Sequence, residues 1–257
     1  IRLSLVGSEM CIRDSFRSFP IEYLVNQTKK LVEGGVKEII LVAQETTLYG
    51  VDLYGKKSLP KLLHNLGLIE GLEWIRILYC YPEEINDELI EAIKNEPKVC
   101  HYLDMPIQHA SDNILKRMGR RTSKQELTDI VAKLRREIPD IALRTTLITG
   151  FPGETDVDHE EVMQFIDECE FDRLGVFTYS REEDTVAAQM PDQIDEEIKE
   201  KYRDELMQLQ QEISADRSAA MIGRIVRVMI EGFIPEDNTY VGRSYKDAPN
   251  VDGLVFV

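Results

Sequence analysis

The apolar positions of this chain follow two different spacings, which alternate along most of its length. Segments whose apolar residues recur every three or four positions predict helices, and short apolar runs rich in β-branched residues predict buried strands. The predicted helices span 21–33, 59–66, 89–93, 111–118, 124–138, 155–169 and 196–213, and the predicted strands span 39–42, 74–78, 102–105, 141–148 and 174–177. This alternation predicts βα units around a parallel sheet, with a loop at 46–57.

The predicted strand at 141–148 breaks abruptly into Gly-Phe-Pro-Gly-Glu at 150–154. Gly150 and Gly153 allow a tight turn or a close approach of the backbone to a ligand, and Pro152 stiffens the bend. Thr155 and Asp158 follow at the spacing of a helix N-cap, and Ser123 and Glu126 show the capping-box spacing at the start of the predicted helix 124–138. On these residues alone, a ligand-binding turn and a simple strand-to-helix turn are both open.

A residue suited to ligand contact follows each predicted strand. These residues are Gln44, Tyr81, Gln108, Gly150 and Tyr179. A parallel barrel gathers such groups over one end of its strands, whereas a doubly wound sheet concentrates them at one switch point. The distribution favours an α/β fold with a partial parallel (β/α) barrel.

The last quarter of the chain changes character. The predicted helix from Glu196 is heavily charged and carries an apolar stripe, which indicates a connector packed on the barrel. The stripe consists of Ile198, Tyr202, Leu206, Leu209 and Ile213. After Ala220, short strand signals at 224–231 and 240–243 alternate with Gly and Pro turns, and 254–257 reads as another strand. We therefore expect a barrel with its connector helix at 16–219 and a small, truncated all-β domain at 220–257.

Composition limits the classes of function. Hydrophobic residues make up 43% of 257 positions, with no apolar run near the roughly 18 residues of a membrane span, so we expect no membrane partner. A net charge of −16 disfavours an unassisted grip on nucleic acid and favours a basic protein partner or a small ligand. The cysteines at 11, 80, 100 and 169 are isolated, which predicts no disulfide framework and fits a reducing cytoplasm.

The first fifteen residues stand apart from this pattern. The chain begins with Ile, and residues 1–15 resemble a translated sequencing adapter, so we expect a segment that is foreign to the protein or disordered. The apolar run at 254–257 reads as a strand cut off within a sheet. Together these features predict an internal fragment of a longer protein.

Several strand-end motifs resemble the radical S-adenosylmethionine (AdoMet) methylthiotransferase family. The similar stretches are 42–47, 79–82, 104–109, 143–155, 171–180 and 245–249, which include Asp-Met-Pro-Ile-Gln-His and Tyr-Lys-Asp-Ala-Pro. The resemblance covers 16–257 and implies a radical-AdoMet partial barrel followed by a truncated TRAM domain. It is stronger to the branch that adds a methylthio group to the β-carbon of an aspartate in a basic small-subunit ribosomal protein. The branch that modifies adenosine in transfer RNA is the second candidate.

The resemblance also assigns site residues. It implies that Gln44 lies near the methionine part of AdoMet and that Gln108 and Arg144 contact its ribose and carboxylate. Gly150 and the Phe-Pro turn would lie against the adenine, and Thr178 and Tyr179 would close the pocket. Arg144 has the alternative of pairing with Glu45 or Asp104. We assign no metal to His101 or His109, because a lone histidine in an α/β protein is usually only hydrogen-bonded.

One departure from the family is large. The family binds a 4Fe-4S cluster through Cys-x-x-x-Cys-x-x-Cys and a second cluster in an amino-terminal domain, and it uses an electron donor. Here Cys11 stands alone, and one thiolate cannot hold a cluster. We therefore expect the chain itself to be inactive, with nucleic-acid contact only through a complete TRAM domain. A clusterless protein-binding module is a third alternative.

Overall fold

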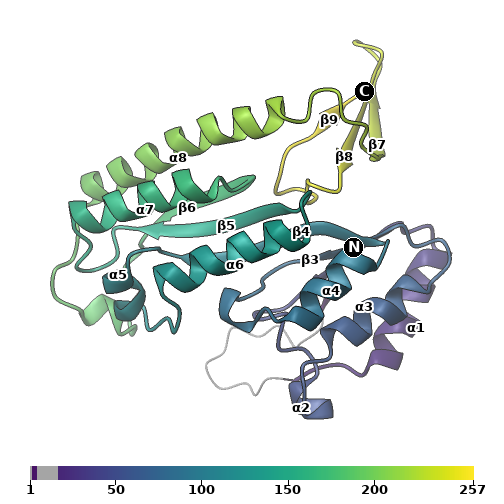
Figure 1. Ribbon diagram of the computed structural model, residues 1–257, viewed down its shortest axis with the longest axis horizontal. Coiled ribbons are helices and arrows are strands. Elements are labelled where there is room, and N and C mark those ends of the chain that lie inside the picture. The colour runs from purple at the N-terminus through teal and green to yellow at the C-terminus, as the bar shows by residue number, and fades with distance from the viewer. Residues whose placement is uncertain (1, 5–16) are drawn as a thin grey trace. The chain divides into compact units, whose positions relative to one another are not determined.

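The computed structural model describes residues 2–4 and 17–257 (Figure 1). The chain divides into two compact units. The first comprises the chain up to Asp104 together with Glu137–Ala142 and Gly223–Val257, and the second comprises Met105–Arg136 and Leu143–Ile222. Strand β4 (Val99–Gln108) passes from the first unit into the second.

The first unit contains a parallel sheet with short buried strands. Its strands are β1 (Arg2–Ser4), β2 (Glu38–Val42), β3 (Trp74–Ile77) and the first part of β4. The neighbours β1–β2, β2–β3 and β3–β4 are all parallel. Every residue of β3 is buried, as expected for a parallel strand covered on both faces.

The helices of this unit begin and end largely where local signals place them. They are α1 (Ile21–Glu33), α2 (Val51–Tyr54), α3 (Leu59–Gly67), the 3-10 turn η1 (Pro82–Glu84) and α4 (Asp87–Asn95). The prediction of a loop at 46–57 was wrong in one respect, because that segment contains the short helix α2. Gly50 and Gly55, with φ of 87° and 68°, bound that single turn, and four residues are too few to show a helical period.

The N-terminal segment set aside in the sequence contributes one short element. Arg2–Ser4 form β1, in which Arg2 lies opposite Ile40 of β2. The rest of the segment, including Cys11, lies outside the described residues. A foreign origin for residues 1–15 stays a prediction.

The second unit begins with the end of β4. Its further elements are α5 (Asp112–Arg117), α6 (Lys124–Glu137), β5 (Ala142–Thr149), α7 (Asp156–Cys169), β6 (Arg173–Thr178), the 3-10 turn η2 (Ala187–Gln189) and α8 (Glu196–Ala219). Strands β5 and β6 are parallel, in register from Arg144 opposite Arg173 to Thr149 opposite Thr178. The capping boxes expected at Ser123 with Glu126 and at Thr155 with Asp158 are both present.

The strand order β1-β2-β3-β4-β5-β6 follows the chain without a reversal. A doubly wound sheet reverses its order at a switch point, whereas a barrel adds each strand beside the previous one. The barrel-type prediction is therefore confirmed. No helix in the described part of the chain is both long and apolar enough to cross a membrane.

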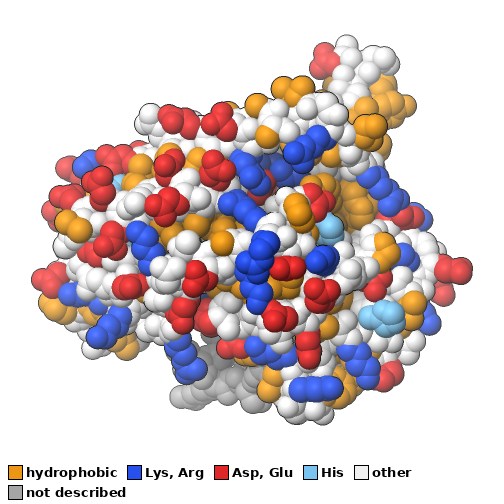
Figure 2. Space-filling view, in the orientation of Figure 1, with side chains coloured by type: hydrophobic (Ala, Val, Ile, Leu, Met, Phe, Trp, Pro, Cys, Tyr) orange, Lys and Arg blue, Asp and Glu red, His pale blue; other side chains and the backbone are white. Residues whose placement is uncertain are grey.

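Helix α8 packs on β6 and α7 through a stripe close to the predicted one. Tyr202, Leu206 and Ile213 are buried as expected, but Ile198 is 41% exposed. Lys199 and Gln210 take buried places on the same face. Acidic side chains are numerous over α7 and α8 (Figure 2).

The small β domain belongs to the first unit. Its antiparallel strands are β7 (Val228–Ile234), β8 (Thr239–Ser244) and β9 (Val255–Phe256), so β7 begins four residues after the predicted start. Met229, Tyr245 and Ala248 pack into one apolar cluster with Trp74 and Tyr102 of the parallel sheet.

Candidate functional site

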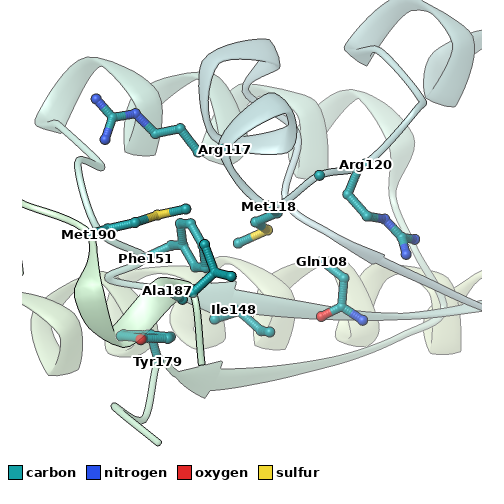
Figure 3. A pocket seen from close by; sticks show the side chains of 11 residues that line it. Gln108, Arg117, Met118, Arg120, Ile148, Phe151, Tyr179, Ala187 and Met190 are labelled. Carbon is teal, nitrogen blue, oxygen red and sulfur yellow. The ribbon is translucent and has the colours of Figure 1, made fainter. Parts of the chain in front are cut away.

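The second unit contains a cavity of about 590 Å³ at the carboxyl ends of its strands (Figure 3). Gln108 comes from the end of β4, Ile148 and Phe151 from the end of β5, and Tyr179 from the end of β6. The remaining walls are the turn after α5 and the segment around η2, which supply Arg117, Met118, Gly119, Arg120, Val186, Ala187 and Met190. Gln108 and Tyr179, two of the five predicted strand-end residues, thus lie together at the carboxyl ends of this unit's strands.

The middle of the cavity is apolar and its edge is polar. Met118, Phe151 and Met190 approach one another from different elements, and the amide of Gln108 lies at one side (Figure 3). The Phe151 and Tyr179 rings meet edge to face, with centroids 5.3 Å apart. A cavity of this volume with few polar groups suits a small ligand that has a flat apolar part and a polar rim.

The two arginines of the cavity wall are turned outward. Figure 3 shows their guanidinium groups pointing away from the middle of the cavity. Arg117 donates a hydrogen bond to the Pro152 carbonyl at 3.3 Å, and Arg120 donates one to the Pro106 carbonyl at 3.0 Å. The aliphatic parts of the two arginines therefore line the cavity, while their guanidinium groups hydrogen-bond the backbone at the ends of β4 and β5.

The glycine turn after β5 is occupied by its own Glu154 side chain and packed against Lys199 and Arg117. One oxygen of Glu154 accepts hydrogen bonds from the amides of Gly150 and Phe151. A side chain at Gly150, whose φ is 73°, would overlap Lys199 of α8, and a side chain at Gly153 would overlap Arg117. The first two amides of the turn are thus already used, and the turn offers the cavity the ring of Phe151.

Of the six predicted site residues, Gln108 and Tyr179 line this cavity. Gly150 is buried against Lys199, and Thr178, opposite Thr149, lies on the other face of the sheet from Ile148. Arg144 shares the face of Ile148 but stands four residues earlier, roughly 13 Å along the strand. Gln44 is exposed in the first unit. The ligand roles of all six stay predictions.

Sequence reasoning missed several lining residues. Phe151 was named only as part of the Phe-Pro turn, and its ring, which is 7% exposed, lies in the cavity wall. Met118 and Met190 come from connecting segments without periodicity, and nothing local distinguishes them from surface residues. Their place in the wall depends on how those segments fold over the strand ends.

A second set of strand-end residues lies in the first unit. Glu45, which follows β2, is buried and accepts hydrogen bonds from Thr47 and from the Tyr81 amide. Burial raises the pKa of the Glu45 carboxyl, although these hydrogen bonds oppose the shift. Glu45 therefore fastens the ends of β2 and β3 together, directly beside Gln44.

The described residues do not fit the ligand set of an iron–sulfur cluster. Cys80, Cys100 and Cys169 are buried and separate, and no group of three His, Cys, Asp or Glu side chains in the described part of the chain could hold a metal. The two histidines considered in the sequence have carboxylate neighbours: His101 lies 2.6 Å from Asp140, and His109 lies 3.3 Å from Glu154.

The comparisons agree with this geometry. Residues 10–166 match the model of the Radical SAM superfamily, and residues 222–257 match a TRAM domain. The chain therefore belongs to the radical SAM superfamily. Among solved structures, it is similar to coproporphyrinogen III oxidase (HemN) of Escherichia coli, with a TM-score of 0.52 and 17% identity over 75% of this chain and 46% of that one. It is also similar to the cobalamin-dependent radical enzyme OxsB with AdoMet bound, with a TM-score of 0.53 and 15% identity over 84% of this chain and 30% of that one.

Curated relatives identify the branch of the family that this chain resembles. The ribosomal protein uS12 methylthiotransferase RimO of Lachnoclostridium phytofermentans is 63% identical over 96% of this chain and 56% of the relative. The protein of the same name from Clostridium botulinum strain Langeland is 53% identical over 95% of this chain and 55% of the relative. The resemblance to the ribosomal-protein branch is confirmed, and the chain spans about half the length of these relatives.

Proposed function

We propose that this chain supplies the adenosyl pocket of a radical-SAM methylthiotransferase whose substrate is an aspartate of a basic small-subunit ribosomal protein. The cavity at the ends of β4, β5 and β6 is the observation that carries this proposal, because its apolar middle and polar edge suit an adenine ring. The relatives' name, ribosomal protein uS12 methylthiotransferase, supplies the reaction and the ribosomal substrate.

The residues of the cavity suggest a division of labour. Phe151, Met118 and Met190 would pack on the faces of the adenine, and the Gln108 amide can both donate to and accept from its polar edge. Tyr179 would close the pocket beside Phe151. Arg144 remains the proposed partner of the AdoMet carboxylate because its fork of donors matches a carboxylate. Gln44 remains the proposed contact of the methionine part.

When bound, an iron–sulfur cluster would supply the electron for radical chemistry, with an external electron donor to reduce it. None of the four cysteines stands in the Cys-x-x-x-Cys-x-x-Cys spacing, and the three in the described part are buried and apart. The chain by itself is therefore proposed to bind AdoMet without converting it. The complete protein is proposed to carry two clusters and to act in the cytoplasm, where its ribosomal substrate is made.

Charge favours the protein substrate over transfer RNA. The net charge of −16, with acidic side chains over α7 and α8, repels phosphates and attracts a basic partner (Figure 2). Transfer-RNA adenosine modification is the second candidate, since residues 222–257 match a TRAM domain that could contact nucleic acid when complete.

Calorimetric titration of this chain with AdoMet tests the pocket. We expect binding that Phe151→Ala weakens by roughly tenfold or more, because a buried aromatic wall is lost. Phe233→Ala, an exposed phenylalanine on β7, is the matched control and should not change the affinity. Absence of binding, or equal effects of the two variants, would overturn the assignment of the cavity.

The substrate is tested on the complete gene product. After anaerobic reconstitution with iron and sulfide, mass spectrometry of the small-subunit ribosomal protein should show the gain of one methylthio group. A gain on transfer RNA in its place would favour the second candidate. Binding of the ribosomal protein with no gain on either would favour the clusterless module.

A further inference from the structure

His109 follows the end of β4 and is completely enclosed. Its side chain is 1% exposed, and its Nδ1 accepts a hydrogen bond from the Ser111 amide at 3.0 Å. An imidazole nitrogen that accepts carries no proton, so in the neutral ring the proton resides on Nε2. The local backbone therefore determines which nitrogen of His109 is the donor.

That donor faces a buried carboxylate. Nε2 of His109 lies 3.3 Å from Oε1 of Glu154, whose side chain is also 1% exposed. Within the described part of the chain, neither atom forms a hydrogen bond, so the two buried atoms face each other as a close polar contact. The other oxygen of Glu154 accepts from the amides of Gly150 and Phe151. This polar contact thus connects the end of β4 to the turn after β5.

We propose that His109 is a positioning residue that sets the place of Phe151 in the cavity wall by orienting Glu154. The inference rests on the proposed function only in that the cavity is taken as the adenosyl pocket. The residue before His109 is Gln108, which lines the cavity with a φ of 73°. Gln108 and Phe151 are therefore held relative to each other by one buried interaction.

A second connection supports the same junction. The hydroxyl of Ser111 donates to Asp158, which belongs to the capping box of α7. The start of α5 and the start of α7 are thus tied together beside the His109–Glu154 contact. If an apolar ring replaced His109, Oε1 of Glu154 would stay buried without the polar neighbour that it now faces, which is costly, and the carboxylate would reorient away from the turn.

Two substitutions separate hydrogen bonding from shape. His109→Phe keeps the size of the ring but provides neither donor nor acceptor. His109→Gln has a different shape but offers an NH₂ donor group and a carbonyl acceptor on one planar amide. If His109 acts through Glu154, H109Q should resemble the wild type more closely than H109F; a purely steric role gives the opposite order.

The first readout requires no ligand. Hydrogen exchange of the Gly150 and Phe151 amides should be roughly tenfold faster in H109F than in the wild type and should be largely restored in H109Q. The second readout is the AdoMet dissociation constant, which should rise roughly tenfold in H109F and recover in H109Q. His101→Phe, at the more exposed histidine beside Asp140, is the control and should change neither readout.

The outcomes are distinguishable. Unchanged exchange at Gly150 and Phe151 in H109F, or better behaviour of H109F than of H109Q, overturns the positioning role. If the wild type does not bind AdoMet, the proposed function fails, while the exchange data still decide the role of His109. Should H109F not fold, nitrogen-15 spectra of histidine in the wild type decide it: a proton on Nε2 of His109 is expected, and a proton on Nδ1 overturns the proposal.

Discussion

Arg243 on β8 donates a hydrogen bond to Glu38 on β2 at 2.6 Å, across 205 positions of the chain. The other oxygen of Glu38 accepts from Arg76 at 2.8 Å, and Arg76 is completely buried. Arg76 also lies 4.6 Å from the centre of the Tyr102 ring. Within the first unit, one buried carboxylate therefore joins the small β domain to the parallel sheet.

Arg243→Met should destabilise the chain by about 3 kcal/mol or more, because it leaves Glu38 buried with one partner fewer. Chemical denaturation followed by fluorescence measures the loss. Arg227→Met is the matched control: Arg227 pairs with Glu73 at the surface, where its side chain is 68% exposed, and should cost less than about 1 kcal/mol. Similar losses for the two variants would contradict the importance of burial.

Gly150→Ala should cost about 3 kcal/mol, the sum of a left-handed backbone and an overlap with Lys199. Gly55→Ala has a similar φ of 68° but open space, so it should cost only about 1 kcal/mol. Combining Gly150→Ala with Lys199→Ala removes the two closest overlapping atoms, Cγ and Cδ of Lys199, and should leave a loss smaller than the sum of the single losses. Strict additivity in this cycle, measured by denaturation, would rule out the contact.

The stability that depends on Asp158 should vary with pH. Burial alone would raise the pKa of this carboxyl, but hydrogen bonds from Ser111, Thr155 and Asn113 outweigh it and lower the pKa below 3.8. A carboxyl whose pKa is lowered by folding stabilises the fold at any pH above its unfolded-state pKa. That contribution is lost as the pH falls through the pKa of the folded state.

The loss of stability caused by Asp158→Asn should therefore be largest at about pH 7 and smaller at about pH 3. Denaturation midpoints at the two pH values test this. Asp167→Asn, at an exposed position of the same helix, is the control and should show a small difference at both. A pH-independent difference for Asp158→Asn would be contrary to expectation.

The buried thiols should resist alkylation. Burial raises the pKa of Cys100 to about 12 and that of Cys169 to about 11, and it raises the pKa of Cys80 well above its ordinary value. At about pH 8 only about one thiol in a thousand of Cys169 is the reactive thiolate. Iodoacetamide should label these three cysteines slowly in the folded chain and rapidly in urea, as read by peptide mass spectrometry. Rapid labelling without urea would show that they are accessible.

The order of helices and strands could be read from the sequence because side-chain period is a local property of the backbone. The runs at Ile39 and Ile75 became buried strands, and the capping pairs at Ser123 and Thr155 began helices where expected. Helix α2 could not be read, since a single turn has no period. Ile198 was assigned to the buried stripe because hydropathy ignores Lys199, whose amine bonds to the Tyr179 carbonyl and to Glu196.

The class of fold and the strand ends that carry polar residues follow from local sequence patterns alone. Which side chains make the cavity wall, and what holds them there, depends on long-range packing. Phe151 faces the cavity because Glu154, Lys199 and Arg117 occupy the inside and back of its turn. The contacts of this turn with Arg117 and Lys199 join residues 36 and 49 positions apart, and no local pattern of polar and apolar residues encodes such pairings.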